Sequence, residues 1–517
     1  MNQEKATTRQ WIAVGGAVLG AFMAVLDVSI TNASLQNIQG ALSASLDEGS
    51  WIATAYLIAE IIVIPLTGWF CQIFSIRKYL LVNAALFLFF SMCCAWAWNL
   101  PSMIVFRALQ GLTGGVLIPT AATIIVSTLP VSQRSIGLAL FGISATFAPC
   151  IGPTIGGWLT INYSWEYIFY LNIIPGIVLM AAIAYAMDPK PMQLQLLKNG
   201  DWWGISFMAV ALGSLTYILE EGNRKDWFGS NEIRYAGVAC VVAFIFFFYI
   251  EFTRKEPFIN LRLLGRRNFA LSSILSLSLG LGLYGSVYIL PLYLASIQHF
   301  DAFQIGKVMM WSGLPQLFIT PFIPKLLQKI DARGMLVIGV SLFATSCFMN
   351  VLMTHDTAAD QLTMSLIVRA LGQPFIMTPL SAVAYEGIEP KNIGSASGLY
   401  NMMRNLGGSL GIGTLGAILT TRYQLHFSRI AEAITQIDIE AQLRIKSLTQ
   451  LFISKGFGAQ VAHDQAIQAI GGTINREAYV MAFSDCFLFM TLALLIAGTG
   501  IFFLKKAKPM GGPVADH

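Results

Sequence analysis

The sequence has few charged residues and few histidines, and it has no phosphate-binding loop. Only 11% of its 517 residues are charged whereas 56% are hydrophobic. A soluble protein of this composition would need a core larger than such a chain normally buries. The five histidines are scattered without the spacing of metal ligands, which argues against an enzyme built on a metal site. The absence of a Gly-Lys nucleotide loop excludes an ATP-driven pump in this chain.

The seven cysteines also lack a pattern. All of them lie in or beside apolar runs, and their spacing suggests neither a disulfide framework nor a zinc site. We therefore expect buried small side chains at these positions, no bound metal and no cofactor.

What the sequence does contain is a repeated apolar run of about 20 residues, the length with which a helix crosses a hydrocarbon core about 30 Å thick. The pattern predicts an all-α integral membrane protein with fourteen spans. The first run leads into polar residues without a small-residue cleavage site, so we expect it to be retained rather than removed as a signal peptide. The predicted spans are centred near residues 22, 61, 89, 119, 148, 178, 211, 244, 282, 317, 342, 375, 408 and 493.

Lys and Arg in the connections predict the orientation, because cytoplasmic loops are enriched in these residues. If the N-terminus is cytoplasmic, nineteen of them lie in inner connections and four in outer ones, leaving aside one long outer loop. Both termini should therefore face the cytoplasm. The net charge of +5 follows from this topology and gives no evidence for a nucleic-acid partner.

A short internal repeat indicates two related halves. "IVFRALQG" (104–111) and "LIVRALGQ" (366–373) lie in spans four and twelve, which correspond if spans seven and eight are an insertion between two six-helix bundles. We predict an N-terminal bundle in 1–187, two inserted helices with linkers in 188–267, and a C-terminal bundle in 268–517. The last includes a long outer loop at about 422–479, whose apolar spacing predicts an external helical hairpin. Its apolar stripe can pack on the bundle, lie at the interface or dock a partner.

Two charged residues are predicted near the outer ends of spans on different helices. Asp27 lies in "FMAVLDVSIT" in span one, and Arg107 enters span four at a similar depth. Charges inside a membrane usually pair or face a water-filled cavity, so the two residues can pair across the bundle. We favour a proton-carrying role for Asp27 over a purely structural ion pair.

Glu60 lies in the middle of span two, in "AYLIAEIIVIPLTGW". A charge at this depth costs about 2.5 to 3.5 kcal/mol on insertion scales. Glu60 is either a proton carrier or a protonated hydrogen-bonding group between helices, and the sequence favours neither. For the other intramembrane charges, Asp485, Arg369 and Arg404, we favour a structural role.

Span five contains "APCIGPTIGGWL" (148–159). Gly152 and Gly156 are four residues apart, a spacing that lets helix backbones approach closely, and Pro153 removes a helix hydrogen bond and bends the axis. Together with Gly157 they suggest a helix contact that can open and close.

At this point a family resemblance can be stated. "LDVSITNASL", "IVFRALQGLTGG", "APCIGPTIGG" and "WEYIFYLNIIPG" resemble the fourteen-helix drug:proton antiporter family of the major facilitator superfamily over essentially the whole chain. The long outer loop is most similar to that of the inner-membrane subunit of Emr-type tripartite multidrug pumps. The resemblance implies the major facilitator fold and proton-driven export from a Gram-negative inner membrane. It also implies a periplasmic adaptor and an outer-membrane channel as partners.

The same resemblance implies roles for particular residues. Asp27 and Arg107 match the first-helix and fourth-helix motifs, and Gly152, Pro153, Gly156 and Gly157 match the antiporter motif. "GWFCQIFSIRK" keeps Gly68, Arg77 and Lys78 of the inner gating loop, but Gln72 replaces the usual Asp and Ser75 the usual Gly. A charge relay at this loop is therefore in doubt. Ala139 and Ala148 replace two upstream glycines of the antiporter motif, so its closest contacts are expected to be looser.

The predicted function is proton-coupled export of hydrophobic or amphipathic small molecules, with the proton gradient as the energy source and the lipid bilayer as the environment. Binding should use an apolar cavity, for which Tyr284, Tyr288 and Tyr293 in "GLYGSVYILPLYL" are candidates. A proton symporter, a sensor, or an exporter of one metabolite such as a fatty acid or siderophore stays open, because the fold alone does not decide between them.

Overall fold

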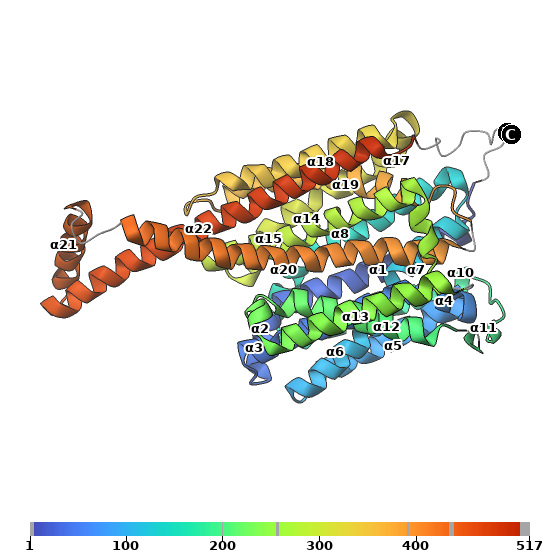
Figure 1. The fold of residues 1–517 in the computed structure, drawn as a ribbon, viewed down its shortest axis with the longest axis horizontal. Helices are drawn as coiled ribbons and strands as arrows, with labels where there is room; N and C mark the ends of the chain where they lie inside the picture. The colour runs from blue at the N-terminus through green and yellow to red at the C-terminus, as the bar shows by residue number, and fades with distance from the viewer. Residues whose placement is uncertain (1–4, 199, 255–257, 390–391, 434–438, 507–517) are drawn as a thin grey trace.

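The computed structural model describes residues 5–198, 200–254, 258–389, 392–433 and 439–506. Within these ranges the secondary structure is entirely helical and contains no β-strand. Twelve helical segments of the described chain are long and apolar enough to cross a membrane. They lie side by side in one elongated bundle (Figure 1). The prediction of an all-α membrane protein is thus confirmed.

The first six spans form the N-terminal part of the bundle. Local sequence sets several helix starts: Thr7 and Gln10 form a capping box before α1, and Asn99 caps the helix that carries Arg107. α6 and α7 together make one span, as do α9 and α10. The elements are α1 Thr8–Ala33, α2 Leu35–Ala41, α3 Leu46–Gly49, α4 Trp51–Phe74, α5 Ile76–Ala95, α6 Leu100–Gly114, α7 Leu117–Thr128, α8 Val131–Asn162, α9 Tyr167–Tyr170 and α10 Ile173–Ala186.

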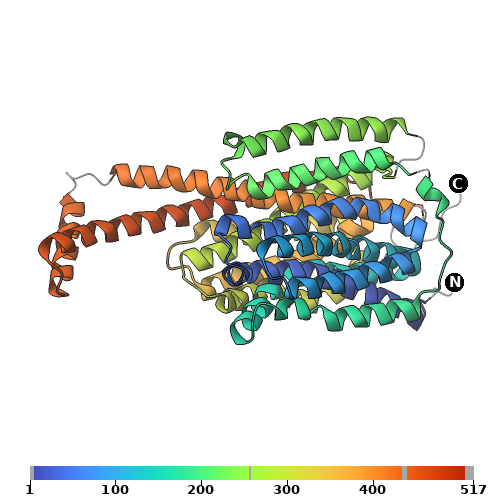
Figure 2. The same cartoon turned by 90° about the horizontal axis from the view of Figure 1, so that it is seen from below.

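The predicted inserted pair consists of α12 and α13, which lie together along one side of the bundle (Figure 2). α12 packs on α4 and also on α20, whereas α13 lies outside it and is the less buried of the two. The pair therefore covers the line where α4 meets α20. Its elements are α11 Gln195–Lys198, α12 Trp202–Glu221, η1 Trp227–Gly229, α13 Asn231–Thr253 and η2 Leu261–Gly265.

In the C-terminal part, two of the predicted spans differ from uniform apolar helices. The segment around residue 317 is broken into short helices, because Pro315, Pro321 and Pro324 each remove a backbone donor. The segment around residue 408 is a continuous helix of 41 residues, α20, which carries Arg404. The elements are α14 Arg267–Ser296, α15 Ala302–Met309, η3 Met310–Ser312, α16 Leu314–Ile319, η4 Thr320–Phe322, α17 Ile323–Lys329, α18 Ala332–Met349, η5 Asn350–Leu352, α19 Ala359–Ala384, α20 Ile393–Ala433, α21 Ile439–Ser454, α22 Ala459–Thr499 and η7 Gly500–Phe503.

The predicted outer loop is a helical projection. The C-terminal part of α20 and the N-terminal part of α22 extend beyond the bundle, and α21 lies at their tip (Figures 1 and 2). The predicted helical hairpin of the loop at about 422–479 is described in part, because residues 434–438 lie outside the described ranges. The start of α1 and the end of η7 lie at the opposite end of the bundle.

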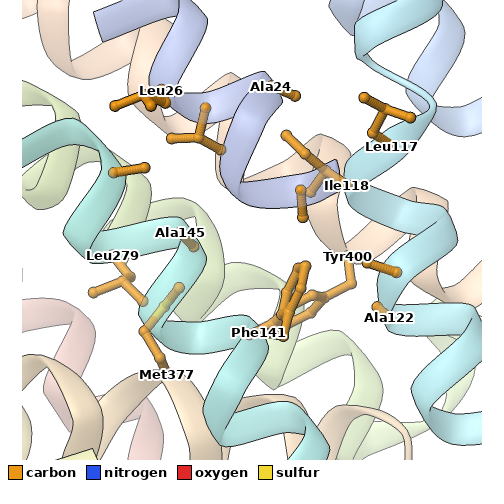
Figure 3. Close-up of a cluster of buried hydrophobic side chains, with 14 of the residues drawn as sticks. Ala24, Leu26, Leu117, Ile118, Ala122, Phe141, Ala145, Leu279, Met377 and Tyr400 are labelled. Atoms are coloured by element: carbon orange, nitrogen blue, oxygen red, sulfur yellow. The ribbon is translucent and has the colours of Figure 1, made fainter. Parts of the chain in front are cut away.

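The two parts of the bundle meet in a contact that we call the central seam. It is formed by α4, α7 and α8 on the N-terminal side and by α15, α19 and α20 on the C-terminal side. Buried apolar side chains fill the region around it (Figure 3), among them Ile118, Phe141, Leu279, Met377 and Tyr400. Burial of this apolar surface stabilises one arrangement of the halves, and the functional residues lie within or beside it.

Candidate functional site

Asp27 and Arg107 form an ion pair inside the N-terminal half. Nη1 of Arg107, on α6, donates to Oδ2 of Asp27, on α1, at 2.6 Å, and both side chains are 1% exposed. The sequence predicts this pairing from the similar depth of the two charges. A buried pair is tolerated only when its remaining donors and lone pairs also find partners, because removing two charges from water is costly.

Two amides supply those partners. Gln110 Nε2 and Asn172 Nδ2 both donate to Asp27 Oδ1, at 3.0 and 2.7 Å. Arg107 also donates to Gln110 Oε1 at 2.7 Å and to the Ile52 carbonyl at 3.3 Å. Neither amide belongs to the predicted site, because buried Gln and Asn have no distinctive spacing. The position of Gln110 one helical turn after Arg107 is the one sequence signal that points to it.

Tyr56 and Glu60 connect this pair to the central seam. The Arg107 guanidinium carbon lies 4.3 Å from the centre of the Tyr56 ring, and the Tyr56 hydroxyl is buried without a hydrogen bond in the part of the chain that the structure describes. Glu60 lies one turn later on α4 and accepts a long hydrogen bond of 3.4 Å from Asn405 Nδ2 on α20. Glu60 therefore faces the C-terminal half, whereas Asp27 lies within the N-terminal half.

Glycines on α6 and beside it make room for these two side chains. A methyl group at Gly114 would lie 2.6 Å from the Tyr56 hydroxyl oxygen, and one at Gly115 would lie 3.0 Å from Glu60 Cγ. Larger residues at either position would push α4 away. The two glycines of "LTGG" therefore allow Tyr56 and Glu60 of α4 to pack closely against the fourth span.

The antiporter-motif glycines bring α8 close to α1. A methyl group at Gly152 would lie 2.5 Å from Ser29 Cβ, and one at Gly156 would lie 3.0 Å from the Ile30 carbonyl oxygen. This is the close approach that the four-residue spacing predicts. α8 continues as one helix through Pro153.

Gly157 differs from its neighbours because it faces the other half. A methyl group there would lie 3.0 Å from the backbone of Ala302 and Phe303 at the start of α15. Ala139 and Ala148, which replace upstream glycines, are both buried. The motif therefore joins a contact within one half to a contact across the central seam.

The predicted gating-loop residues lie at the other end of α4. Gly68 packs directly against the backbone of Gly394 on α20, with no room for a Cβ. Arg77 donates to the Ala184 carbonyl at 2.9 Å, within the N-terminal half, and Lys78 is half-buried. The closest link between the halves at this position is thus a glycine contact.

Ser75 occupies a strained backbone position between α4 and α5. Its φ of 64° and ψ of 144° lie in a region that glycine adopts readily and other residues rarely do. The gating motif usually has a glycine at this position, and this backbone conformation explains why.

The three candidate tyrosines of α14 have different neighbours. Tyr284 packs against α20, and Tyr288 lines a cavity of about 670 Å³ near the base of the helical projection. Tyr293 is buried and donates to the carbonyl oxygens of Thr354 and Thr357, both at 2.8 Å. Its hydroxyl is thereby fixed within the C-terminal half.

Two other intramembrane charges have structural partners. Asp485 on α22 accepts from Arg422 at 2.5 Å and lies 2.7 Å from His426 Nε2. These two contacts join α22 to α20 at the base of the projection. Arg369, the repeat counterpart of Arg107, donates to the Leu283 carbonyl at 3.4 Å. These contacts agree with the structural roles that the sequence favours.

Membrane-length helices in two halves, with charged residues buried at and beside their contact, define a helical multi-pass membrane protein of the transporter type. The comparison with known families supports this class. Residues 17–412 match the model of the Major Facilitator Superfamily. The chain belongs to that superfamily and is a multi-pass protein of the cell inner membrane.

Individual relatives and structures agree with this membership. The chain is similar to the colistin resistance protein EmrB of Acinetobacter baumannii, with 34% identity over 96% of this chain and 97% of the relative. It is also similar to the multidrug export protein EmrB of Escherichia coli strain K12, with 28% identity over 96% and 95% of the two chains. Among solved structures, the proton:xylose symporter XylE matches with a TM-score of 0.56 and 13% identity, over 94% of this chain and 95% of XylE. That last likeness concerns the fold alone.

Proposed function

We propose that this protein exports hydrophobic and amphipathic small molecules, such as drugs, across the inner membrane in exchange for protons. Its similarity to proteins named for multidrug export and colistin resistance supports drug efflux. The observation that carries proton coupling is the buried Asp27–Arg107 pair. Membrane-buried carboxylates are rare and usually mark ion pathways.

Asp27 is the proposed site of proton exchange. Its carboxylate accepts hydrogen bonds from Arg107, Gln110 and Asn172, as an ionised acid does. A proton on Asp27 removes the attraction to Arg107 and weakens the contact between α1 and α6. Because Asp27 is buried here, exchange takes place in another state of the cycle, in which this region reaches water.

Alternating access is the proposed mechanism. The halves move relative to each other about the central seam, so that the pathway opens to one face at a time. The glycine contacts of Gly68 with Gly394, and of Gly157 with α15, are positions where the backbones of the two halves lie directly against each other. Moving one charge across 100 mV supplies about 2.3 kcal/mol, so the proton gradient can drive export without a cofactor. Glu60 is a second candidate carrier or a neutral hydrogen-bonding partner of Asn405.

The proposed topology has fourteen spans with both termini cytoplasmic. The broken segment α15 to α17 and the long helix α20 are the two spans beyond the twelve uniformly apolar ones. Burial against other helices allows non-uniform segments to cross a membrane. The predicted bundles 1–187 and 268–517, with the pair in 188–267 between them, remain the proposed organisation.

Transport in proteoliposomes tests the proposed function. A reconstituted protein should take up a hydrophobic drug when a proton gradient is imposed, while a pH-sensitive dye reports proton movement in the opposite direction. Drug and proton movement in the same direction would instead indicate a symporter. Transport of a single metabolite and of no drug from a panel would indicate a specific exporter.

The helical projection is proposed to contact a periplasmic adaptor, which in turn joins an outer-membrane channel. Its support is the extension of α20 and α22 beyond the bundle, with exposed apolar residues such as Leu443 and Leu451 on α21. Deleting about residues 430–470 should reduce adaptor co-purification more than proton-coupled transport in liposomes. Equal recovery of the adaptor would argue against docking at this surface.

A further inference from the structure

Arg404 is a buried cation in the central seam. It lies on α20 and is 1% exposed. Its guanidinium carbon is 5.8 Å from the ring centre of Phe141, which belongs to α8 of the other half. The side chain of Arg404 therefore lies where the two halves meet.

The guanidinium of Arg404 has no hydrogen-bond partner in the described parts of the chain. This holds for Nε, Nη1 and Nη2 alike. Arg107, at similar burial, donates to a carboxylate, an amide oxygen and a backbone carbonyl. A buried arginine with five free N–H groups in a planar fork is suited to receive a planar or tetrahedral anion.

No carboxylate of the described chain forms an ion pair with Arg404. Glu60, on α4, lies across the seam and accepts a hydrogen bond from Asn405, the residue that follows Arg404. Glu60 makes no hydrogen bond to the Arg404 guanidinium within the described residues. Tyr284 of α14 packs against Gly408, one turn after Arg404 on α20. The fork thus remains open to a ligand when the halves separate.

Aromatic and apolar side chains lie on the Phe141 side of Arg404. Phe141 and Tyr400 lie together in the buried cluster of Figure 3, which also contains Met377 and Leu279. A cationic fork next to an apolar surface matches a molecule with an anionic head and a hydrocarbon body. Arg369 lacks this setting, because its hydrogen bond and its contact with the Phe343 ring both stay within the C-terminal half.

We infer that Arg404 binds the anionic head group of an amphipathic substrate, whose apolar part lies against Phe141 and Tyr400 in the central seam. The inference rests on the proposed function and narrows its substrate class to include amphipathic anions. The head group replaces water at the guanidinium when the seam opens toward the cytoplasm, and it leaves when the seam opens outward.

A matched pair of probes tests this assignment. Decanesulfonate and decyltrimethylammonium have the same chain and permanent charges of opposite sign, so neither crosses the bilayer as a neutral acid. Uptake of each is measured in proteoliposomes with an imposed proton gradient. Arg404→Gln should lower the ratio of sulfonate to ammonium uptake by about tenfold to a hundredfold, the usual worth of a hydrogen bond to a charged group. Arg369→Gln is the matched control and should leave the ratio as in the unmodified protein.

Each outcome of this experiment has a distinct meaning. If the unmodified protein moves the ammonium probe or a neutral drug but not the sulfonate, the anion site is wrong and the proposed function stands. If it moves no probe under a proton gradient, the proposed function fails as well. An equal fall of both uptakes in Arg404→Gln would show a structural role and overturn the inference.

A binding measurement covers the case in which Arg404→Gln does not fold. Decanesulfonate, below its micellar concentration, should raise the unfolding temperature of the purified protein more than decanol or decyltrimethylammonium does, because only a ligand of the folded state stabilises it. Glu60→Gln should strengthen the sulfonate effect by removing the acid that faces Arg404. Equal stabilisation by all three decyl compounds would overturn the assignment.

Discussion

Replacing Asp27 by asparagine tests the ion pair most directly. Asparagine has nearly the same shape, so the oxygen that accepts from Gln110 and Asn172 can be kept. The other carboxylate oxygen becomes an NH₂ group that faces Arg107 Nη1 at the position of a 2.6 Å hydrogen bond. Two donors then oppose each other, and Arg107 becomes a buried charge without a counter-ion.

The expected cost follows from this geometry. Removing one partner of a fully buried, hydrogen-bonded pair typically costs about 3 to 5 kcal/mol, because the remaining charge stays desolvated. Asp188→Asn is a matched control, since Asp188 also accepts from an arginine at 2.6 Å but is 74% exposed. An exposed pair is worth roughly 0 to 1 kcal/mol. The two variants remove the same charge from pairs of equal length, so the comparison measures what burial and the surrounding amide network add to the pair.

The assay combines stability with transport. Asp27→Asn should unfold several degrees below the unmodified protein, whereas Asp188→Asn should unfold close to it. In proteoliposomes, Asp27→Asn should stay in the membrane and lose substrate-coupled proton movement, because asparagine takes up no proton. Normal coupling in Asp27→Asn would refute the assignment of proton exchange to this residue. Normal stability would refute the energetic account of the pair.

Two further predictions concern backbone geometry. Ser75→Gly should stabilise the protein by about 1 kcal/mol. The substitution relieves backbone strain that costs roughly 1 to 3 kcal/mol, and the greater flexibility of glycine in the unfolded chain offsets part of this gain. A lower unfolding temperature in a thermal scan would contradict this prediction. Gly157→Val should block transport by overlapping Ala302 across the seam, whereas Gly15→Val, with open space around its position, should transport normally. Equal transport by both valine variants would show that the seam tolerates the added bulk.

Much of the architecture follows from the sequence because a bilayer constrains it strongly. Apolar runs have to be about 20 residues long to span the hydrocarbon core, so most helices can be predicted by length alone. The same constraint makes an intramembrane charge conspicuous, and it leads directly to the pairing of Asp27 with Arg107. The glycine spacing of Gly152 and Gly156 likewise predicts a close helix contact, which α8 and α1 form.

The remaining features of the site depend on contacts between residues that are far apart in the chain, and sequence patterns do not reveal these contacts. In the sequence, Gln110 and Asn172 are ordinary polar residues, but the fold brings both side chains to one carboxylate oxygen of Asp27. Arg369 and Arg404 look alike in sequence, yet the first has a backbone acceptor and the second has none in the described chain. The continuous helix α20 also exceeds its predicted span, because helix propensity does not end at the membrane surface.

The position of α4 suggests how a proton at Asp27 can influence the seam. Within two turns of this helix, Tyr56 stacks on Arg107 and Glu60 accepts from Asn405 of the other half. If Asp27 takes up a proton, Arg107 loses its counter-ion and keeps the Tyr56 ring as a nearby partner, since a ring face attracts a cation. A shift of Arg107 toward Tyr56 therefore acts on the helix that holds the two halves together. Coupling in this arrangement needs no charge relay at the gating loop, which agrees with the replacement of its usual acid by Gln72.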